Sequence, residues 1–169
     1  MNNLSSIVMP QSITVIGDSA FNGCSSLTSI TIPTNVTSVG NKVFDGCTGL
    51  TSVVWNAKKC GGWTNNGKES PFFAVASQIK SFTFGSEVDS IPSYLCYGMS
   101  NIPEITILDS VTSIGDSVFY GCSKLVTISI PSTMKYIGRN ALGNNVQNVV
   151  LHPTTPPMIE DTGWSRYQG

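Results

Sequence analysis

The sequence predicts an α/β-type repeat solenoid that is mostly β, with a parallel sheet on one face and short helical or irregular segments on the other. Three observations predict this fold class. A unit of 23 residues recurs along the chain, apolar residues alternate early in each unit, and a turn glycine follows in the middle of it. Self-similarity at a period of about 20 to 50 residues is the signature of stacked repeats, in which each unit buries its flanks against its neighbours.

The clearest copy of the unit spans residues 27–49 and reads LTSITIPTNVTSVGNKVFDGCTG. Related copies align before and after it. They span residues 4–26, 27–49, 50–78 with an insertion, 79–101, 102–124, 125–145 and, as a partial copy, 146–169. We therefore expect a single domain over residues 1–169. Since neither end shows a polar capping unit, we also expect this domain to be a fragment of a longer repeat protein.

The first half of each copy predicts a strand and an extended return segment. In the clearest copy, Ile30 and Ile32 alternate with polar neighbours, as in a strand with one buried face. Pro33 lacks a backbone donor and is expected to end the strand. Val36 and Val39 then point inward from the return segment. Stacking such copies pairs their strands in parallel and makes one continuous core.

The second half of each copy predicts a tight turn and a short helical segment. Gly40 marks the turn, and Val43 and Phe44 have the spacing of a helical turn that Gly46 closes. An aromatic or other apolar residue is expected to point inward here in each regular copy. This column contains Phe21, Phe44, Cys96, Phe119 and Leu142.

The five cysteines are predicted to be mainly structural. Cys24, Cys47 and Cys122 share one repeat position, which Met99 holds in copy four, so the position is expected to be a buried apolar slot. Cys24 and Cys47 come close enough for a disulfide, but parallel side chains give poor geometry, so we expect free thiols. Cys60 lies in the insertion and is, of the five cysteines, the one expected to be most exposed or reactive, although a structural role is favoured for it as well. With one histidine and no C-x-x-C, the sequence predicts no metal site.

The stretch 56–78, NAKKCGGWTNNGKESPFFAVASQ, replaces the return segment and helical turn of copy three. Its glycines and asparagines indicate a loop, and insertions in repeat proteins map to surface loops. One hypothesis is therefore a projecting binding loop. Its candidate residues are Lys58, Lys59, Trp63 and Lys68. The alternative is that Phe72 or Phe73 refills the aromatic column and that Trp63 covers the core.

The outward positions of the strands form a second candidate surface. This ribbon is nearly uncharged and rich in small hydroxyl side chains that could meet a protein or a glycan. The candidate residues are Ser29, Thr31, Val54, Thr83, Glu104 and Thr106. The alternative is that Thr and Val are simply suited to a strand surface, and no large aromatic anchor lies in the ribbon.

Composition and motifs exclude several classes of function. A net charge of −1 with 11% charged residues gives no footprint for nucleic acid or anionic membrane. No apolar run is long enough for membrane insertion, and the first residues lack the layout of a signal peptide. Asp18 and Asp116 follow turn glycines and are expected in the first turn of a helix. No triad, phosphate loop or dinucleotide motif occurs, so we predict no catalysis and no cofactor.

The pattern I-x-x-I-G-x-x-A/V-F-x-G-C-x-x-L-x-x-I-x-I-P resembles the BspA-like leucine-rich repeats of bacterial surface proteins. The match is most specific over Leu4–Leu50 and Ile102–Pro131. The resemblance implies a curved, right-handed leucine-rich repeat stack at the bacterial cell surface or outside the cell. It also implies adhesion or recognition of a host, matrix or bacterial surface protein. A structural spacer in a larger surface protein and a glycan-binding module are the alternatives.

The C-terminal stretch predicts an irregular end to the stack. Residues 146–153 begin a seventh copy that is not completed in the normal pattern. The proline-rich tail that follows contains apolar and aromatic residues at Met158, Ile159, Trp164 and Tyr167. One expectation is that this tail folds back as a makeshift cap, and the other is that the last strand offers an unpaired edge.

Overall fold

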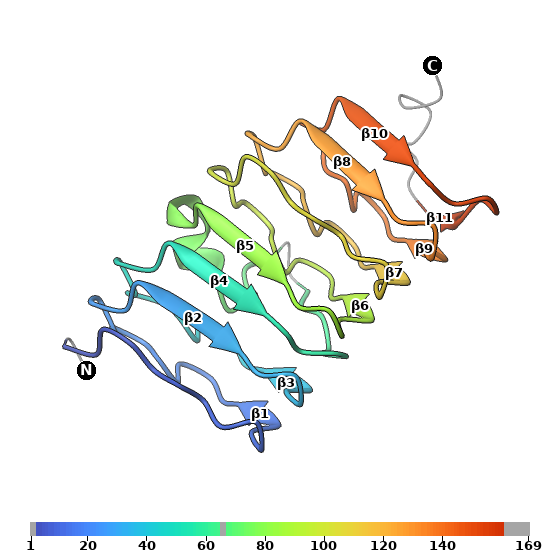
Figure 1. Ribbon diagram of the computed structural model, residues 1–169. Helices are drawn as coiled ribbons and strands as arrows, with labels where there is room; N and C mark the ends of the chain where they lie inside the picture. Colours follow the sequence, from blue (N-terminus) through green and yellow to red (C-terminus); the bar gives the residue numbers. More distant parts are fainter. Residues whose placement is uncertain (1–2, 65–66, 161–169) are drawn as a thin grey trace.

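The computed structural model describes residues 3–64 and 67–160, and it is a parallel β-solenoid of about six turns (Figure 1). Copies two, three, four, six and seven each contribute one strand to a face of four-residue strands, and each turn contributes one short strand or extended segment to the opposite, return side. The first and the last described residues lie at opposite ends of the stack. The predicted fold class, a mostly β repeat solenoid with a parallel sheet on one face, is confirmed.

Two parallel sheets make up the strand face. β2 (Ser29–Ile32) pairs with β4 (Ser52–Trp55), and β4 pairs with β5 (Ser81–Phe84). Further along, β8 (Thr127–Ile130) pairs with β10 (Asn148–Leu151). In β2, β5 and β8 every second residue is buried, because alternate side chains of a strand point to opposite faces.

Short two-residue strands line the return side. β1 (Val15–Ile16) pairs with β3 (Ser38–Val39). β6 (Ser90–Ile91), β7 (Ser113–Ile114), β9 (Tyr136–Ile137) and β11 (Met158–Ile159) follow one another in a second parallel sheet. The extended return segment predicted from the sequence is therefore present, and its inward residues are buried, as in Val39 and Ile114.

The strand face is interrupted at copy five. Residues 103–107 form no backbone hydrogen bond with copy four or copy six in the described chain. At the equivalent position of copy four, the Lys80 N–H donates to the Thr51 carbonyl at 2.8 Å. Pro103 takes this position in copy five and has no N–H to donate, so the ladder loses its first bond to copy four. The return side stays paired here through β6, β7 and β9.

The insertion in copy three stays within the stack. The backbone N–H groups of Lys58 and Gly61 donate to copy two, and the N–H of Trp63 donates to the Ser93 carbonyl of copy four. The 3₁₀ helix η2 (Phe73–Gln78) then occupies the turn side. The expectation that residues 56–78 replace the return segment is therefore wrong for residues 56–64. Two of the residues in this segment, Ala57 and Cys60, point into the core and are buried.

The predicted helical turn at Val43 and Phe44 is absent, and a plain turn takes its place. Backbone bonds between copies replace helical ones: the Phe21 N–H, for example, donates to the Val43 carbonyl at 3.0 Å. The expected role of Asp18 and Asp116 at a helix start is also wrong. The Asp18 carboxylate accepts from the backbone N–H of Asn41 in the next copy at 2.8 Å. Asp116 does the same for the backbone N–H of Arg139 at 2.8 Å.

The core is a set of columns that run along the stack. Phe21 stacks on Phe44, with ring centroids 5.6 Å apart, and Phe44 stacks on Phe72 at 4.8 Å. Phe72 therefore refills the aromatic column of copy three, as predicted for one of the two phenylalanines, while its neighbour Phe73 is exposed. Dispersion and apolar burial along such columns supply most of the stabilisation of a repeat stack.

The seventh copy continues further than the sequence suggested. β10 pairs with β8, and β11 then pairs with β9, so the chain runs through a full strand and return segment. Met158 and Ile159 extend the return sheet and do not fold back over the end of the stack. Trp164 and Tyr167, the other residues of the expected cap, lie outside the described residues.

Candidate functional site

The strand-face candidates all lie on the outer surface of the solenoid. Val54 is half-buried between neighbouring strands, and the others are exposed. The exposed residues are Ser29, Thr31, Thr83, Glu104 and Thr106. The structure divides this set by position: Thr83, Glu104 and Thr106 border the interruption at copy five, whereas Ser29, Thr31 and Val54 lie on the continuous sheet.

A groove of about 540 Å³ runs between β5 and residues 103–108. Its lining comprises Lys80, Ser81, Phe82, Thr83, Phe84, Pro103, Glu104, Thr106 and Leu108. The rims carry one positive and one negative side chain, Lys80 and Glu104. The backbone N–H groups of residues 104–107 have no protein partner among the described residues. The groove thus combines apolar side chains with unpaired backbone donors and acceptors.

The structure separates the four residues of the predicted loop site. Lys58, Lys59 and Lys68 are exposed, but Trp63 is 6% exposed and belongs to the core. Its indole Nε1–H donates to the Val39 carbonyl at 3.1 Å, and its ring meets Trp55 edge-on at 6.2 Å. Trp63 touches a shallow pocket of about 250 Å³ whose lining includes Glu69 and none of the lysines. Trp63 therefore covers the core, as in the alternative interpretation.

The cysteine thiols are buried and free. Cys60 is 8% exposed, more than the other four cysteines, but it is buried and has the favoured structural role, because its return segment is held inside the stack. Burial raises the pKa of the Cys60 thiol to about 11 and that of Cys122 to about 12. Burial, with the nearby Cys122 as a smaller cause, also raises the pKa of Cys96 well above its usual value. These thiols are in their unreactive, protonated form at neutral pH.

The described residues contain no group of three or more His, Cys, Asp or Glu side chains placed to hold a metal ion. His152, the sole histidine of the sequence, contacts the Ser129 hydroxyl at 3.0 Å on the strand face. In the insertion, the Thr64 hydroxyl donates to a Glu69 carboxylate oxygen at 2.7 Å. The groove and the insertion both offer hydroxyl, charged and apolar side chains for recognition by shape, hydrogen bonding and apolar contact.

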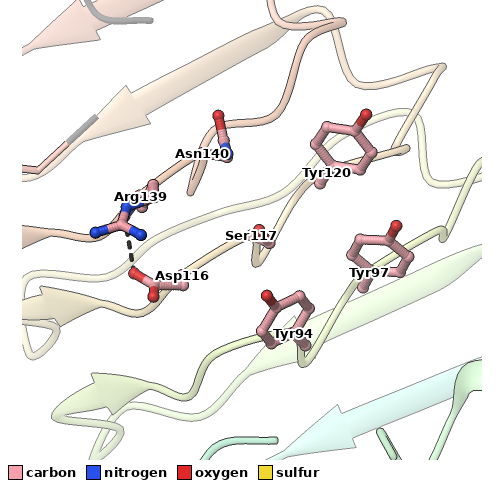
Figure 2. Close-up of a pocket in the computed structure, with 7 residues that line it drawn as sticks. All are labelled: Tyr94, Tyr97, Asp116, Ser117, Tyr120, Arg139 and Asn140. Atoms are coloured by element: carbon pink, nitrogen blue, oxygen red, sulfur yellow. Dashed lines mark hydrogen bonds between the residues drawn. The ribbon is translucent and has the colours of Figure 1, made fainter. Parts of the chain in front are cut away.

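A third surface feature was missed by the sequence reasoning. A pocket of about 400 Å³ is lined by Tyr94, Tyr97, Asp116, Ser117, Tyr120, Arg139 and Asn140. Figure 2 shows the three tyrosines on one side of it and Asp116 beside Arg139 on the other. A signal was available in the repeat alignment. Tyr97 and Tyr120 hold a position that is polar in copies one and two, where Asn22 and Asp45 stand.

The stacked strands, the glycine turns and the apolar columns define the class of this chain: it is a leucine-rich repeat solenoid. A model of the BspA type leucine rich repeat region matches residues 1–61 and 68–160, with six copies. The chain belongs to this family, as its repeat pattern indicated. Among curated proteins, no relative matches the chain.

Solved structures of bacterial leucine-rich repeat proteins resemble the chain. One from Bacteroides ovatus is 27% identical with a TM-score of 0.65, and the match covers 91% of this chain and 37% of that one. A leucine-rich cell surface protein from Faecalibacterium prausnitzii is 26% identical with a TM-score of 0.57, and the match covers 89% of this chain and 40% of that protein. The leucine-rich repeat protein of T. pallidum is 19% identical with a TM-score of 0.53, and the match covers 95% of this chain and 77% of that protein. This likeness shows the shared fold. The chain thus spans well under half the length of the first two.

Proposed function

We propose that this chain is a non-catalytic protein-binding scaffold that holds an extended segment of a partner protein on its strand face. Leucine-rich repeats generally mediate protein interactions and are generally non-catalytic. The observation that carries the proposal is the groove at copy five, where unpaired backbone groups border the free edge of β5. An exposed strand edge recruits extended peptides through main-chain hydrogen bonds.

The side chains of the groove indicate what kind of segment fits. Phe82 and Phe84 are buried beneath its surface, and Thr83 and Thr106 offer hydroxyls above it. With Lys80 and Glu104 as its charged residues, the groove has no net charge and favours a segment of low net charge. A groove of this size accepts only a short segment, so we expect affinities of about micromolar strength.

We further propose that the scaffold acts outside the cell or on the bacterial cell surface, in adhesion to a host, matrix or bacterial surface protein. The support is the family and the cell-surface description of the F. prausnitzii relative. Within the described residues, none of the helices has the length and apolarity needed to cross a membrane. The uncharged strand ribbon suits protein contact better than contact with a polyanion.

The test is a selection of binders followed by charge insertion. The immobilised chain is screened against purified extracellular-matrix proteins and a displayed random-peptide library. We expect Thr83→Arg and Thr106→Arg to weaken the selected binders at least tenfold, because each places a long cation in the groove. Thr31→Arg is the matched control, since Thr31 is an exposed threonine on the same face outside the groove. Equal loss with Thr31→Arg would place the partner elsewhere on the face.

Two other outcomes contradict the groove proposal in different ways. If Lys58→Ala, Lys59→Ala or Lys68→Ala weakens binding while Thr83→Arg does not, the insertion is the binding surface. If no protein or peptide is captured at all, the chain behaves as a structural spacer within a longer protein.

A further inference from the structure

The pocket on the turn side contains an aromatic column formed by Tyr97 and Tyr120 (Figure 2). The rings of Tyr97 and Tyr120 are stacked at 5.5 Å with an interplanar angle of 12°. Gly67 covers the other face of Tyr97, since a Cβ on that glycine would lie 2.8 Å from the ring. In copy six, Gly143 follows in the column, and a Cβ there would meet the Tyr120 Cα at 3.0 Å. Within residues 3–64 and 67–160, no side chain therefore continues the column, and Tyr120 is 38% exposed.

The stack itself does not require these tyrosines. Copies one and two hold the equivalent position with Asn22 and Asp45, which make the same turn. Tyr94 has a left-handed backbone conformation, with a φ of 62°. The residue at this position is left-handed in every regular copy. Asn140 holds that position in copy six, and Asn tolerates this conformation better than Tyr. The aromatic residues are thus a departure from the repeat that its packing does not explain.

Polar groups surround the open ring. The Asp116 carboxylate accepts from the backbone N–H of Arg139 through one oxygen, at 2.8 Å. Its second oxygen, the Arg139 guanidinium and the Asn140 carboxamide make no hydrogen bond with the described residues. The same is true of the hydroxyls of Tyr97 and Tyr120. The pocket therefore presents donors and acceptors beside a flat apolar surface.

These features select one class of ligand. Asp116 repels anions and Arg139 repels cations, so a neutral ligand is favoured. A proline-rich peptide would stack on Tyr120, but its backbone offers only acceptors and leaves Asp116 without a donor. A hexose ring has an apolar C–H face for the tyrosine and hydroxyls that both donate and accept. The volume of about 400 Å³ is within the usual range of small-molecule pockets.

We propose that this pocket binds a neutral hexose unit of a glycan, stacked on Tyr120 and held by Asp116, Arg139 and Asn140. This site is separate from the strand-face groove and does not depend on it. The hexose can belong to a host glycoprotein or to a bacterial polysaccharide, because both present the same ring.

The test uses the full chain and saturation-transfer NMR with methyl glucoside, methyl galactoside and methyl mannoside, followed by an array of host glycans and bacterial polysaccharides. We expect a signal with at least one neutral glycoside, and the array shows from which source the best ligand comes. Tyr120→Asn should reduce binding at least tenfold, and it keeps the fold because Asn22 holds this position in copy one. Asp116→Asn should weaken binding less.

Phe73→Ala is the control, since Phe73 is an exposed aromatic residue outside the pocket, and Thr83→Arg should also leave sugar binding unchanged. The proposal is overturned if none of the neutral glycans binds, if only sialylated or sulfated glycans bind, or if Tyr120→Asn binds like the unmodified chain. The strand-face proposal is unaffected by each of these results, so the two can fail independently.

Discussion

At the scale of single residues, Trp63 shows how an apparent binding residue serves the core. Its ring lies edge-on to Trp55, and its indole N–H bonds to the Val39 carbonyl in the neighbouring copy. We expect Trp63→Ala to lower the free energy of unfolding by about 3 to 5 kcal/mol, as for other buried aromatic residues. Urea denaturation followed by circular dichroism measures this change. Lys59→Ala, at an exposed position, is the control and should change it by less than about 0.5 kcal/mol. A loss below about 1 kcal/mol for Trp63→Ala would contradict its role in the core.

The buried thiols make stability depend on alkaline pH. The pKa of Cys60 rises from 9.0 to about 11 in the folded chain because of burial. Between these two values the folded state holds a proton that the unfolded state has lost, so stability is constant below pH 9 and falls as pH rises. The loss from this thiol is at most about 3 kcal/mol. Unfolding curves from pH 8 to 11 should fall less steeply for Cys60→Ala than for the unmodified chain. Parallel curves for the two proteins would show that the thiol contributes nothing.

At the scale of the elements, the turn glycines pack directly on one another. Gly23 and Gly46 both have left-handed φ angles, of 74° and 73°. A Cβ on Gly46 would approach the Gly23 backbone to 3.2 Å, whereas a Cβ on Gly23 would meet nothing within 4 Å. We expect Gly23→Ala to cost about 1 to 2 kcal/mol for its backbone conformation, and Gly46→Ala to cost at least about 1 kcal/mol more. Chemical denaturation of both variants measures the difference, and equal losses would mean that contact between copies is unimportant.

The interruption at copy five predicts an unusual pattern of amide exchange. Residues 104–107 lie in the middle of the stack, yet their N–H groups have no partner in the described chain. We expect them to exchange hydrogen faster than the amides of β4 and β5. Pro103→Thr restores the missing donor and should slow this exchange.

The free energy of unfolding is a poor measure of what Pro103→Thr does to the strand face. The hydrogen bond gained, about 0.5 to 1.5 kcal/mol, is offset by the lost rigidity of proline, about 0.4 to 1 kcal/mol. Exchange mass spectrometry is the suitable measurement. Strong protection of residues 104–107 in the unmodified chain would contradict the open edge.

The repeat pattern predicted the fold because one rule recurs in every copy: Ile30 and Ile32 point inward, and the strands of successive copies follow the same register. The repeat pattern predicted less of the structure in copies whose sequence departs from it. The insertion read as a loop because Gly61 and Gly62 favour turns, but backbone bonds to both neighbouring copies hold it in place. The tyrosine pocket requires residues from copies four, five and six together, and the alignment shows only that Tyr120 replaces a polar residue.

At the scale of the whole molecule, the breaks in strand pairing on the two sides of the solenoid fall at different copies. The return side has no strand pairing between β3 and β6, at copy three, where β2, β4 and β5 remain continuous. The strand face is unpaired at copy five, where β6, β7 and β9 remain continuous, and at copy one, where β1 pairs with β3. Each break is therefore bridged by the opposite sheet and by the apolar columns, which run through both. A stack with such staggered breaks keeps its nearest-neighbour coupling along its full length.

This arrangement predicts that the described stack unfolds as one cooperative unit. Trp164, the third tryptophan of the sequence, is first replaced by Phe, so that the fluorescence of Trp55 and Trp63 reports on copy three, whereas circular dichroism reports on all copies. Leu125→Ala removes a fully buried side chain from copy six and should cost about 2 to 5 kcal/mol. If the breaks are bridged, this distant change shifts the tryptophan fluorescence midpoint in urea as far as the circular dichroism midpoint. A fluorescence midpoint that stays in place while circular dichroism shows an earlier transition would mean that copy five divides the solenoid into two independently unfolding parts.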